Sequence, residues 1–314
     1  MSRAVVFPGQ GSQAVGMGRE LADAFQEARD VFGEVDEALK QKLSALMWEG
    51  PEGDLTLTEN AQPALMAVSL AVIRILERQG NWTISGKAAM VAGHSLGEYS
   101  ALAAAGTFSL ADTARLLKIR GQAMQRAVPV GQGAMAALLG VEIDQAREIA
   151  AEASAGEVCE AANDNAPGQV VVSGARAAVE RAMAISAARG FKRSVLLPVS
   201  APFHCALMKP AADAMAEALA GVAMAAPVVP VIANVTAAPT RDPDEIRKLL
   251  VAQVTGTVRW RESVIAMRDA GVDHLVEAGS GKVLAGLTKR IDKAIAAVSL
   301  NVPADIEAFL KASE

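Results

Sequence analysis

A serine inside a Gly-x-Ser-x-Gly pentapeptide is the first group in this sequence that can do chemistry. The short apolar run 88–92 leads into Gly93-His94-Ser95-Leu96-Gly97, and small and apolar residues continue to Ala105. This order predicts a strand, a sharp turn and a helix, with glycines that tolerate crowding and a serine hydroxyl held above the sheet edge. Ser95 is therefore a candidate nucleophile beside a helix N-terminus. The pentapeptide alone is equally compatible with a purely conformational turn.

A nucleophilic serine needs a base, and the chain has three histidines, His94, His204 and His274. His94 adjoins Ser95, where neighbouring side chains on a tight turn diverge, and His274 stands at a turn-to-strand entry typical of a structural role. His204 remains as the candidate that takes the hydroxyl proton, although a residue in this position can also be a simple cap at a helix start. Three aspartates lie between Ser95 and His204 without any context that marks one as a triad acid: Asp112, Asp144 and Asp164.

An arginine occupies an unexpected position in the helix predicted over 109–127. Ser109-x-x-Asp112 is typical of a capping box, and the apolar stripe of the helix contains Arg120. A guanidinium directed toward a core is costly unless it meets an anion. Two interpretations remain, a buried salt bridge to a local acid or a fork that binds a substrate carboxylate. The nearby serine motif favours the fork, since planar two-point binding is particular to arginine.

Two glycine-rich segments suggest nucleotide sites, and both fit poorly. Gly9-x-Gly11-x-x-Ala14 matches a dinucleotide fingerprint, but the second strand is missing because residues 19–47 predict helix, which makes a nicotinamide-binding protein a minor alternative. The segment 277–284 fails as a phosphate loop, because Val276 and Val283 replace the required glycine and hydroxyl residue. We interpret it as a strand-to-helix turn.

Composition limits the class of protein. The chain has 314 residues, 52% of them hydrophobic, which suffices for one large domain or two, and a net charge of -5 argues against a dedicated nucleic-acid binder. The apolar run near the N-terminus is too short for the core of a signal peptide, and no apolar run reaches membrane-spanning length. We therefore expect no membrane association and a cytoplasmic location. Cys159 and Cys205 lack metal-ligand spacing, and neither a metal nor a disulfide framework is predicted.

The elements that must position these groups fall into two parts. A strand is predicted over 4–7 and a long helix over 58–79. After Pro129 the pattern changes to strand, helix, two strands, helix and strand, over 134–141, 144–153, 158–162, 169–173, 177–188 and 193–198. This order predicts a ferredoxin-like small domain at 129–199. We expect it to interrupt an α/β-hydrolase-like large domain built from 1–128 and 200–314, with the active site in the cleft between them.

Motifs along nearly the whole chain resemble those of the malonyl-CoA:acyl carrier protein transacylases. They are GQGSQ, TENAQPALMAVS, GHSLGEYSAL, KIRGQAMQ, the Asn-x-Pro-Gly-Gln segment at 165–169, the histidine segment at 200–208 and AQVTGTVRW. The resemblance implies that Ser95 is the nucleophile and His204 its base, oriented by the backbone carbonyl of Gln253. It also implies an oxyanion hole formed by the N–H groups of Gln10 and Leu96, and Arg120 as the ligand of the malonyl carboxylate.

Further roles follow from the same resemblance. Gln62 reaches the floor of the site, or is an ordinary helix-start residue beside Pro63, and Asn165 lines the site, or serves only its turn. Phe203 is compatible with a small malonyl group in preference to branched acyl groups. The sequence departs from the family pattern at Thr257, where a proline commonly precedes Val-x-Trp.

The function that these motifs imply is transfer of malonyl from malonyl-CoA to the phosphopantetheine thiol of holo acyl carrier protein, by ping-pong kinetics through a malonyl-serine. We expect no bound cofactor, a monomer, and transient electrostatic docking of the acidic carrier protein by basic residues such as Lys192, Arg193, Lys282, Lys289 and Arg290. The alternatives are a serine thioesterase or esterase on the same fold and an acyltransferase that serves a polyketide pathway.

Overall fold

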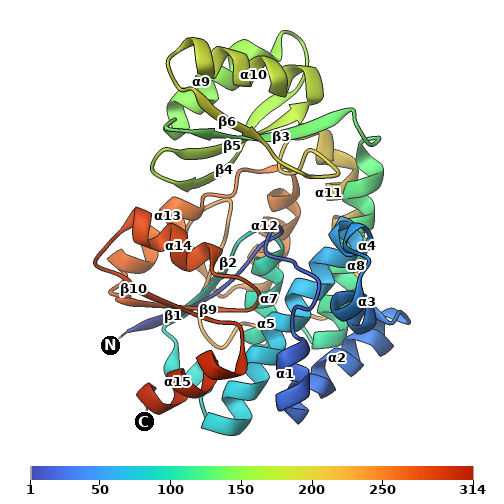
Figure 1. The fold of residues 1–314 in the computed structure, drawn as a ribbon, viewed down its shortest axis with the longest axis vertical. Coiled ribbons are helices and arrows are strands. Elements are labelled where there is room, and N and C mark those ends of the chain that lie inside the picture. Colours follow the sequence, from blue (N-terminus) through green and yellow to red (C-terminus); the bar gives the residue numbers. More distant parts are fainter. Residues whose placement is uncertain (1, 314) are drawn as a thin grey trace.

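The computed structural model describes residues 2–313, which form a mixed α/β fold with two separate sheets (Figure 1). The larger sheet has six strands in the order β10 (Ala296–Leu300), β9 (His274–Ala278), β1 (Arg3–Phe7), β2 (Met90–Gly93), β7 (Val231–Ile232) and β8 (Pro239–Thr240). Its strands are parallel except for β8, which runs antiparallel to β7. The smaller sheet has four antiparallel strands in the order β4 (Cys159–Ala166), β5 (Gln169–Ala175), β3 (Gly133–Leu139) and β6 (Arg193–Leu196).

Helices cover both faces of the larger sheet, and this explains the continuous apolar sequence of its central strands. Alternate residues of β1 belong to different cores: Val5 and Phe7 belong to the largest cluster, whereas Ala4 and Val6 belong to a second one with Trp260. The helices are α1 (Arg19–Ala24), α2 (Gln26–Leu39), α3 (Leu43–Glu49), α4 (Glu52–Thr56), α5 (Thr58–Gly80), α6 (Ile84–Lys87), α7 (Leu96–Ala104), α8 (Leu110–Ala127), α9 (Ile143–Ser154), α10 (Arg176–Ala188), the 3-10 turn η1 (Ala206–Met208), α11 (Lys209–Ala220), α12 (Pro243–Thr255), α13 (Trp260–Asp269), α14 (Val283–Ile291) and α15 (Pro303–Ser313).

The predicted long helices are confirmed in α5 and α8, and the Ser109 hydroxyl accepts from the N–H of Asp112 at the start of α8. The helical segment predicted over 19–47 is found as three helices. It is divided into α1, α2 and α3, because Phe25 is extended and Lys40 is left-handed (φ 50°). No second strand of a dinucleotide fold occurs there.

The smaller sheet is covered on one side by α9 and α10, at the top of Figure 1, and the predicted order of strands and helices is found. Ala134, Ala136 and Leu138 of β3 pack into this local core, whereas Met135 and Ala137 join the largest cluster. The sheet therefore packs on the rest of the molecule through its other face. The largest difference in a boundary is at the end of β4, which extends to Ala166 and leaves only 167–168 for the expected turn at 165–169.

A short segment after α12 joins the two sheets. The N–H of Val258 donates to the carbonyl of Ala162 and its carbonyl accepts from the N–H of Asp164, both at 2.9 Å. The hydroxyl of Thr257 donates to the Ala161 carbonyl at 2.7 Å. The threonine at the family's usual proline position thus adds a hydrogen bond between the two parts of the fold. Within residues 2–313, no helix is long and apolar enough to cross a membrane.

Candidate active site

Ser95 lies in the turn between β2 and α7, directly before the first residue of that helix. Its backbone has φ 53° and ψ -111°, a strained conformation for a residue with a side chain. A Cβ on Gly93 would lie 1.9 Å from the backbone of Gly97, and a Cβ on Gly97 would lie 2.2 Å from the Phe7 carbonyl oxygen. The two glycines of the pentapeptide are therefore required by close backbone packing, and the turn they permit is the sharp strand-to-helix elbow expected from the sequence.

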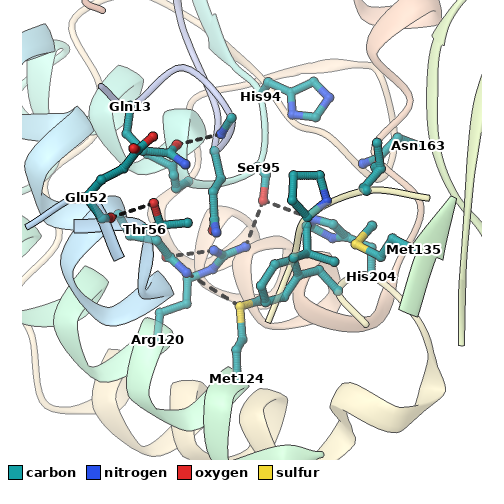
Figure 2. A pocket seen from close by; sticks show the side chains of 18 of the residues that line it. Gln13, Glu52, Thr56, His94, Ser95, Arg120, Met124, Met135, Asn163 and His204 are labelled. Atoms are coloured by element: carbon teal, nitrogen blue, oxygen red, sulfur yellow. Dashed lines mark hydrogen bonds between the residues drawn. The ribbon is translucent and has the colours of Figure 1, made fainter. Parts of the chain in front are cut away.

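His204 lies directly against this turn, with its Nε2 2.8 Å from Ser95 Oγ (Figure 2). Its Nδ1 is 2.9 Å from the carbonyl oxygen of Gln253. A carbonyl only accepts, so Nδ1 carries the proton and Nε2 is the free acceptor that faces the serine. Burial and the nearby Arg120 charge lower the pKa of His204 to about 3, which keeps the imidazole neutral. His204 does not cap a helix: its backbone is left-handed (φ 59°), and η1 begins two residues later.

None of the three aspartates between Ser95 and His204 reaches this imidazole. Asp112 bonds Ser109 and Arg115, Asp144 bonds Arg147, and Asp164 bonds Arg261. The position of a triad acid is taken by the backbone carbonyl of Gln253.

Arg120 is 1% exposed and reaches the serine from α8. Its Nη2 donates to Ser95 Oγ at 3.1 Å and to Gln253 Oε1 at 2.7 Å, and its Nη1 donates to Gln62 Oε1 at 2.8 Å. Its Nε is buried without an acceptor. Among residues 2–313, no carboxylate lies within salt-bridge distance of Arg120, which argues against the local ion pair and leaves a buried cation facing the nucleophile.

A cavity of about 700 Å³ opens in front of these groups. Phe203, Met124 and Met135 form part of an apolar wall, and Asn163 and His94 add polar groups (Figure 2). The remaining lining residues are Gln10, Gly11, Gln13, Glu52, Gly53, Thr56, Gln62, Ser95, Leu96, Arg120, Leu197, Pro198, Val199 and His204. The lining residues include Ser95 beside the larger sheet and Met135 and Asn163 of the smaller sheet, so the site lies where the two parts of the fold meet.

The residues expected in the oxyanion hole both line this cavity. Leu96 is the first residue of α7, so its N–H has no partner within the helix. Gln10 follows β1, and its side-chain oxygen accepts from the Thr58 hydroxyl at 2.9 Å. The GQGSQ segment therefore contributes to this cavity.

Gln62 fits both earlier interpretations, since it lies early in α5 and also lines the cavity. It is buried, its Nε2 donates to Thr58 Oγ1 at 2.9 Å, and its Oε1 accepts from Arg120. Asn165, in contrast, is absent from the cavity lining. Its Oδ1 lies 2.8 Å from Nε2 of His94, whose ring packs on Trp260. The asparagine that faces the cavity is Asn163.

The third histidine lies elsewhere. His274 begins β9 and its Nδ1 is 2.7 Å from Asp273 Oδ1.

Sequence reasoning missed two buried residues beneath the elbow. Asn234 accepts from the N–H of Ser95 at 2.8 Å and donates from Nδ2 to the Gly93 carbonyl at 2.7 Å. Glu98 is 1% exposed, and its Oε2 accepts from the N–H of Asn234 and from Gln253 Nε2. An acid three residues after the serine in an otherwise apolar helix was a usable signal for Glu98. Asn234 lies in a loop with no marking pattern.

A strained serine, a neutral histidine held by a carbonyl and a buried arginine form a site for transfer of an acyl group through serine. Residues 4–297 match the family described as acyl transferase domain, and the chain belongs to this family of acyltransferases. It is 48% identical to the malonyl CoA-acyl carrier protein transacylase of Escherichia coli K12, over 98% of both chains.

Two solved structures are similar over almost the whole chain. The acyl-carrier-protein S-malonyltransferase of Bartonella henselae is 56% identical, with a TM-score of 0.97 and 99% coverage of both chains. A malonyl-transacylase in complex with its type II PKS acyl-carrier protein is 42% identical, with a TM-score of 0.96 and coverage of 99% of this chain and 100% of that one.

Proposed function

We propose that this protein transfers the malonyl group from malonyl-CoA to the phosphopantetheine thiol of holo acyl carrier protein, by ping-pong kinetics through a malonyl-serine. The observation that carries the proposal is the buried Arg120 guanidinium, 3.1 Å from Ser95 Oγ and without a carboxylate partner among residues 2–313. An acyl group that ends in a carboxylate supplies the missing anion. The family and its malonyl-transferring relatives support the same substrate.

In the first half-reaction, Ser95 Oγ attacks the thioester carbonyl of malonyl-CoA and passes its proton to His204 Nε2. The negative oxygen of the tetrahedral intermediate is received by the N–H groups of Gln10 and Leu96, where one such donor typically contributes about 3 to 4 kcal/mol. The C–S bond then breaks, and the proton held by His204 goes to the departing thiolate. Arg120 releases Ser95 Oγ and binds the malonyl carboxylate.

In the second half-reaction, the carrier-protein thiol gives its proton to His204 and attacks the malonyl-serine ester. The intermediate collapses to a malonyl thioester, and the proton returns to Ser95 Oγ. The acyl group thus moves between two thiols, and we propose that no bound cofactor or metal takes part. The phosphopantetheine arrives with the carrier protein.

The two parts of the fold correspond in this proposal to an α/β-hydrolase-like large domain, 1–128 and 200–314, and a ferredoxin-like small domain, 129–199. The mostly parallel six-stranded sheet with a serine elbow after β2 supports the first. The second is supported by the strand order β4-β5-β3-β6, whose two central strands are the first and third of the domain.

Basic residues are the candidate docking groups for the acidic carrier protein. Five basic residues are exposed, Lys192, Arg193, Lys282, Lys289 and Arg290. Arg290 also bonds the side chain of Gln169 and the Pro167 carbonyl, so it joins α14 to the small sheet. We propose a transient electrostatic encounter with an acidic carrier by a monomeric enzyme, and the cytoplasmic location stays a prediction.

Intact-mass spectrometry tests the reaction. Mixing the protein with malonyl-CoA is expected to add one malonyl group, holo carrier protein is expected to remove it, and Ser95→Ala is expected to acquire none. Adduct formation that persists in Ser95→Ala contradicts the nucleophile. Loss of the adduct to water at the same rate with and without carrier protein would favour a thioesterase instead.

The pathway served by the product is a separate question. The type II PKS relative is similar along the whole chain, as is the Escherichia coli transacylase. Transfer rates to a fatty-acid carrier protein and to a polyketide carrier protein distinguish these two uses of the same chemistry.

A further inference from the structure

The side-chain amide of Gln253 lies between the nucleophile and the carboxylate-binding arginine. Its Oε1 accepts from Arg120 Nη2 at 2.7 Å, and its Nε2 donates to the Ser95 carbonyl at 2.9 Å and to Glu98 Oε2 at 2.8 Å. Gln253 is fully buried, so each end of its amide must find a partner of the right kind. The contacts demand one orientation, with the oxygen toward Arg120 and the NH2 toward Ser95 and Glu98.

Glu98 provides an acceptor that makes this orientation of the Gln253 amide more stable than the flipped orientation. In the flipped amide, the NH2 group would face the Arg120 donor, and the oxygen would face Glu98 Oε2, so two contacts would become repulsive. The Ser95 carbonyl, which also accepts from the N–H of Glu98 at 3.0 Å, opposes the flipped amide in the same way, and Glu98 makes the shorter of the two contacts with Nε2. Glu98 is itself held, since its Oε2 also accepts from the N–H of Asn234 at 3.1 Å.

We propose that Glu98 is a positioning residue for acyl-group selection: through the amide of Gln253 it holds Arg120 where a terminal carboxylate on the acyl group can bind. Glu98 does not line the cavity, so it can influence the substrate only indirectly, through Gln253 and Arg120. The inference rests on the proposed malonyl transfer, and it adds that discrimination between carboxylated and uncarboxylated acyl donors depends on a residue outside the cavity.

The acceptor atom, rather than the negative charge, is what the geometry requires. Both hydrogen bonds converge on Oε2, so a proton on Oε1 leaves them in place. Burial raises the pKa of Glu98 to about 7, against the opposing effect of the bonds from Gln253 and Asn234, so a protonated form is accessible near neutrality. An amide oxygen at the same place can accept the same two bonds.

Three variants test the relay. Glu98→Gln keeps an oxygen acceptor on a side chain of the same length. Glu98→Asp moves the acceptor away from Gln253 by one methylene group. Glu98→Met removes the acceptor and replaces Glu98→Asp in the test if that variant does not fold. Glu277→Asp is the matched control, because Glu277 is also fully buried and accepts from the backbone of Leu284 and Ala285 at the start of α14, away from the cavity.

The measurement is kcat/KM for malonyl-CoA and for acetyl-CoA, which lacks the carboxylate, with holo carrier protein as acceptor. We expect Glu98→Asp or Glu98→Met to lower the malonyl-to-acetyl ratio about tenfold, the effect of losing one buried hydrogen bond. Glu98→Gln is expected to stay within about threefold of the wild-type ratio, and Glu277→Asp is expected to leave the ratio unchanged.

A loss equal for both donors in Glu98→Asp and Glu98→Met would overturn the relay, because it shows a structural role alone. An unchanged ratio in those variants overturns it too, as does a Glu98→Gln ratio as low as theirs. If the wild-type protein itself shows no preference for malonyl-CoA, the proposed function fails, and that outcome is visible before any variant is compared.

Discussion

The Nδ1–H of His204 donates to the backbone carbonyl of Gln253 over 2.9 Å, and this bond fixes the tautomer in which Nε2 is free to accept a proton. Because the acceptor is a neutral carbonyl, nothing at this position stabilises an imidazolium as a carboxylate does. Burial and the nearby Arg120 charge outweigh the hydrogen bond to Gln253, which raises the pKa of His204, and they keep Nε2 unprotonated and facing Ser95 Oγ. We therefore expect the His204 imidazole to stay neutral, and able to accept a proton from Ser95, over a wide pH range.

The first prediction concerns the pH dependence of serine reactivity. Since the pKa of His204 is lowered to about 3, the labelling rate of Ser95 by an uncharged fluorophosphonate is expected not to fall with a midpoint near 6.5 as pH decreases from 8 to 5. His204→Ala should be slower at every pH by a factor of about 10² to 10⁴. A decline in the wild type centred near 6.5 would show an ordinary, solvated imidazole.

The second prediction concerns the carboxylate ligand. Arg120→Ala is expected to lower malonyl-CoA kcat/KM by about 100-fold, the loss of charge-assisted hydrogen bonds to the substrate, with transfer from acetyl-CoA spared or improved. Arg120→Lys should not restore the malonyl rate, because an ammonium lacks the planar fork. Undiminished malonyl transfer in Arg120→Ala would remove this residue from substrate binding.

The third prediction concerns the pH dependence of stability. Burial raises the pKa of Glu98 from 4.5 to about 7, so the folded state retains a proton that the unfolded state releases between these values. The stability associated with this group is complete below pH 4.5 and is lost as pH rises through 7. At roughly 1.4 kcal/mol per pKa unit, the loss is about 3 kcal/mol.

Glu98→Gln cannot titrate, so its free energy of unfolding relative to wild type is expected to rise by about 3 kcal/mol between pH 4.5 and pH 7.5. Urea unfolding at several pH values measures this difference, and His204 titrates in both proteins and cancels. A relative stability that stays constant across this range is inconsistent with a carboxyl group of raised pKa.

The fourth prediction compares two glycines. A methyl group on Gly93 would collide with the Gly97 backbone at 1.9 Å, so Gly93→Ala must displace the elbow, and we expect loss of Ser95 labelling and destabilisation of about 3 kcal/mol or more. Gly33 lies within α2 with open space around it. Gly33→Ala is expected to stabilise the protein by about 0.5 to 1 kcal/mol with normal labelling, as judged by thermal unfolding.

Local patterns in the sequence were sufficient to predict features that depend on a single turn or helix. The glycine spacing around Ser95 predicts the elbow because the crowding arises within a few residues and against the adjoining strand. The apolar stripe of α8 places Arg120 on the inner face for the same kind of reason, helical periodicity. The helical segment over 19–47 is interrupted at 25 and at 40–42, where residues leave the helical conformation, and periodicity does not reveal these interruptions.

Contacts between distant segments needed the tertiary structure. Asn165 and Asn163 stand two positions apart on β4, yet one meets His94 and the other faces the cavity. Residues two apart on a regular strand share a face, but the pairing of β4 with β5 has register shifts between 161 and 163 and between 164 and 166, which no local pattern encodes. Glu98 and Asn234 are 136 residues apart, and their bond exists only once β2 and the loop after β7 are neighbours.

The sequence by itself identified the candidate groups for the chemistry: a serine on a glycine turn, one suitable histidine, and an arginine on an apolar helix face, with motifs that resemble those of malonyl transferases. Only the tertiary structure decided how these groups are held. It showed that none of the three aspartates between Ser95 and His204 reaches the imidazole, that Arg120 has no carboxylate partner among residues 2–313, and that Gln253 connects Arg120 to Glu98. Residue types and spacing follow from local backbone geometry, whereas hydrogen-bond partners depend on which strands and helices become neighbours in the folded chain.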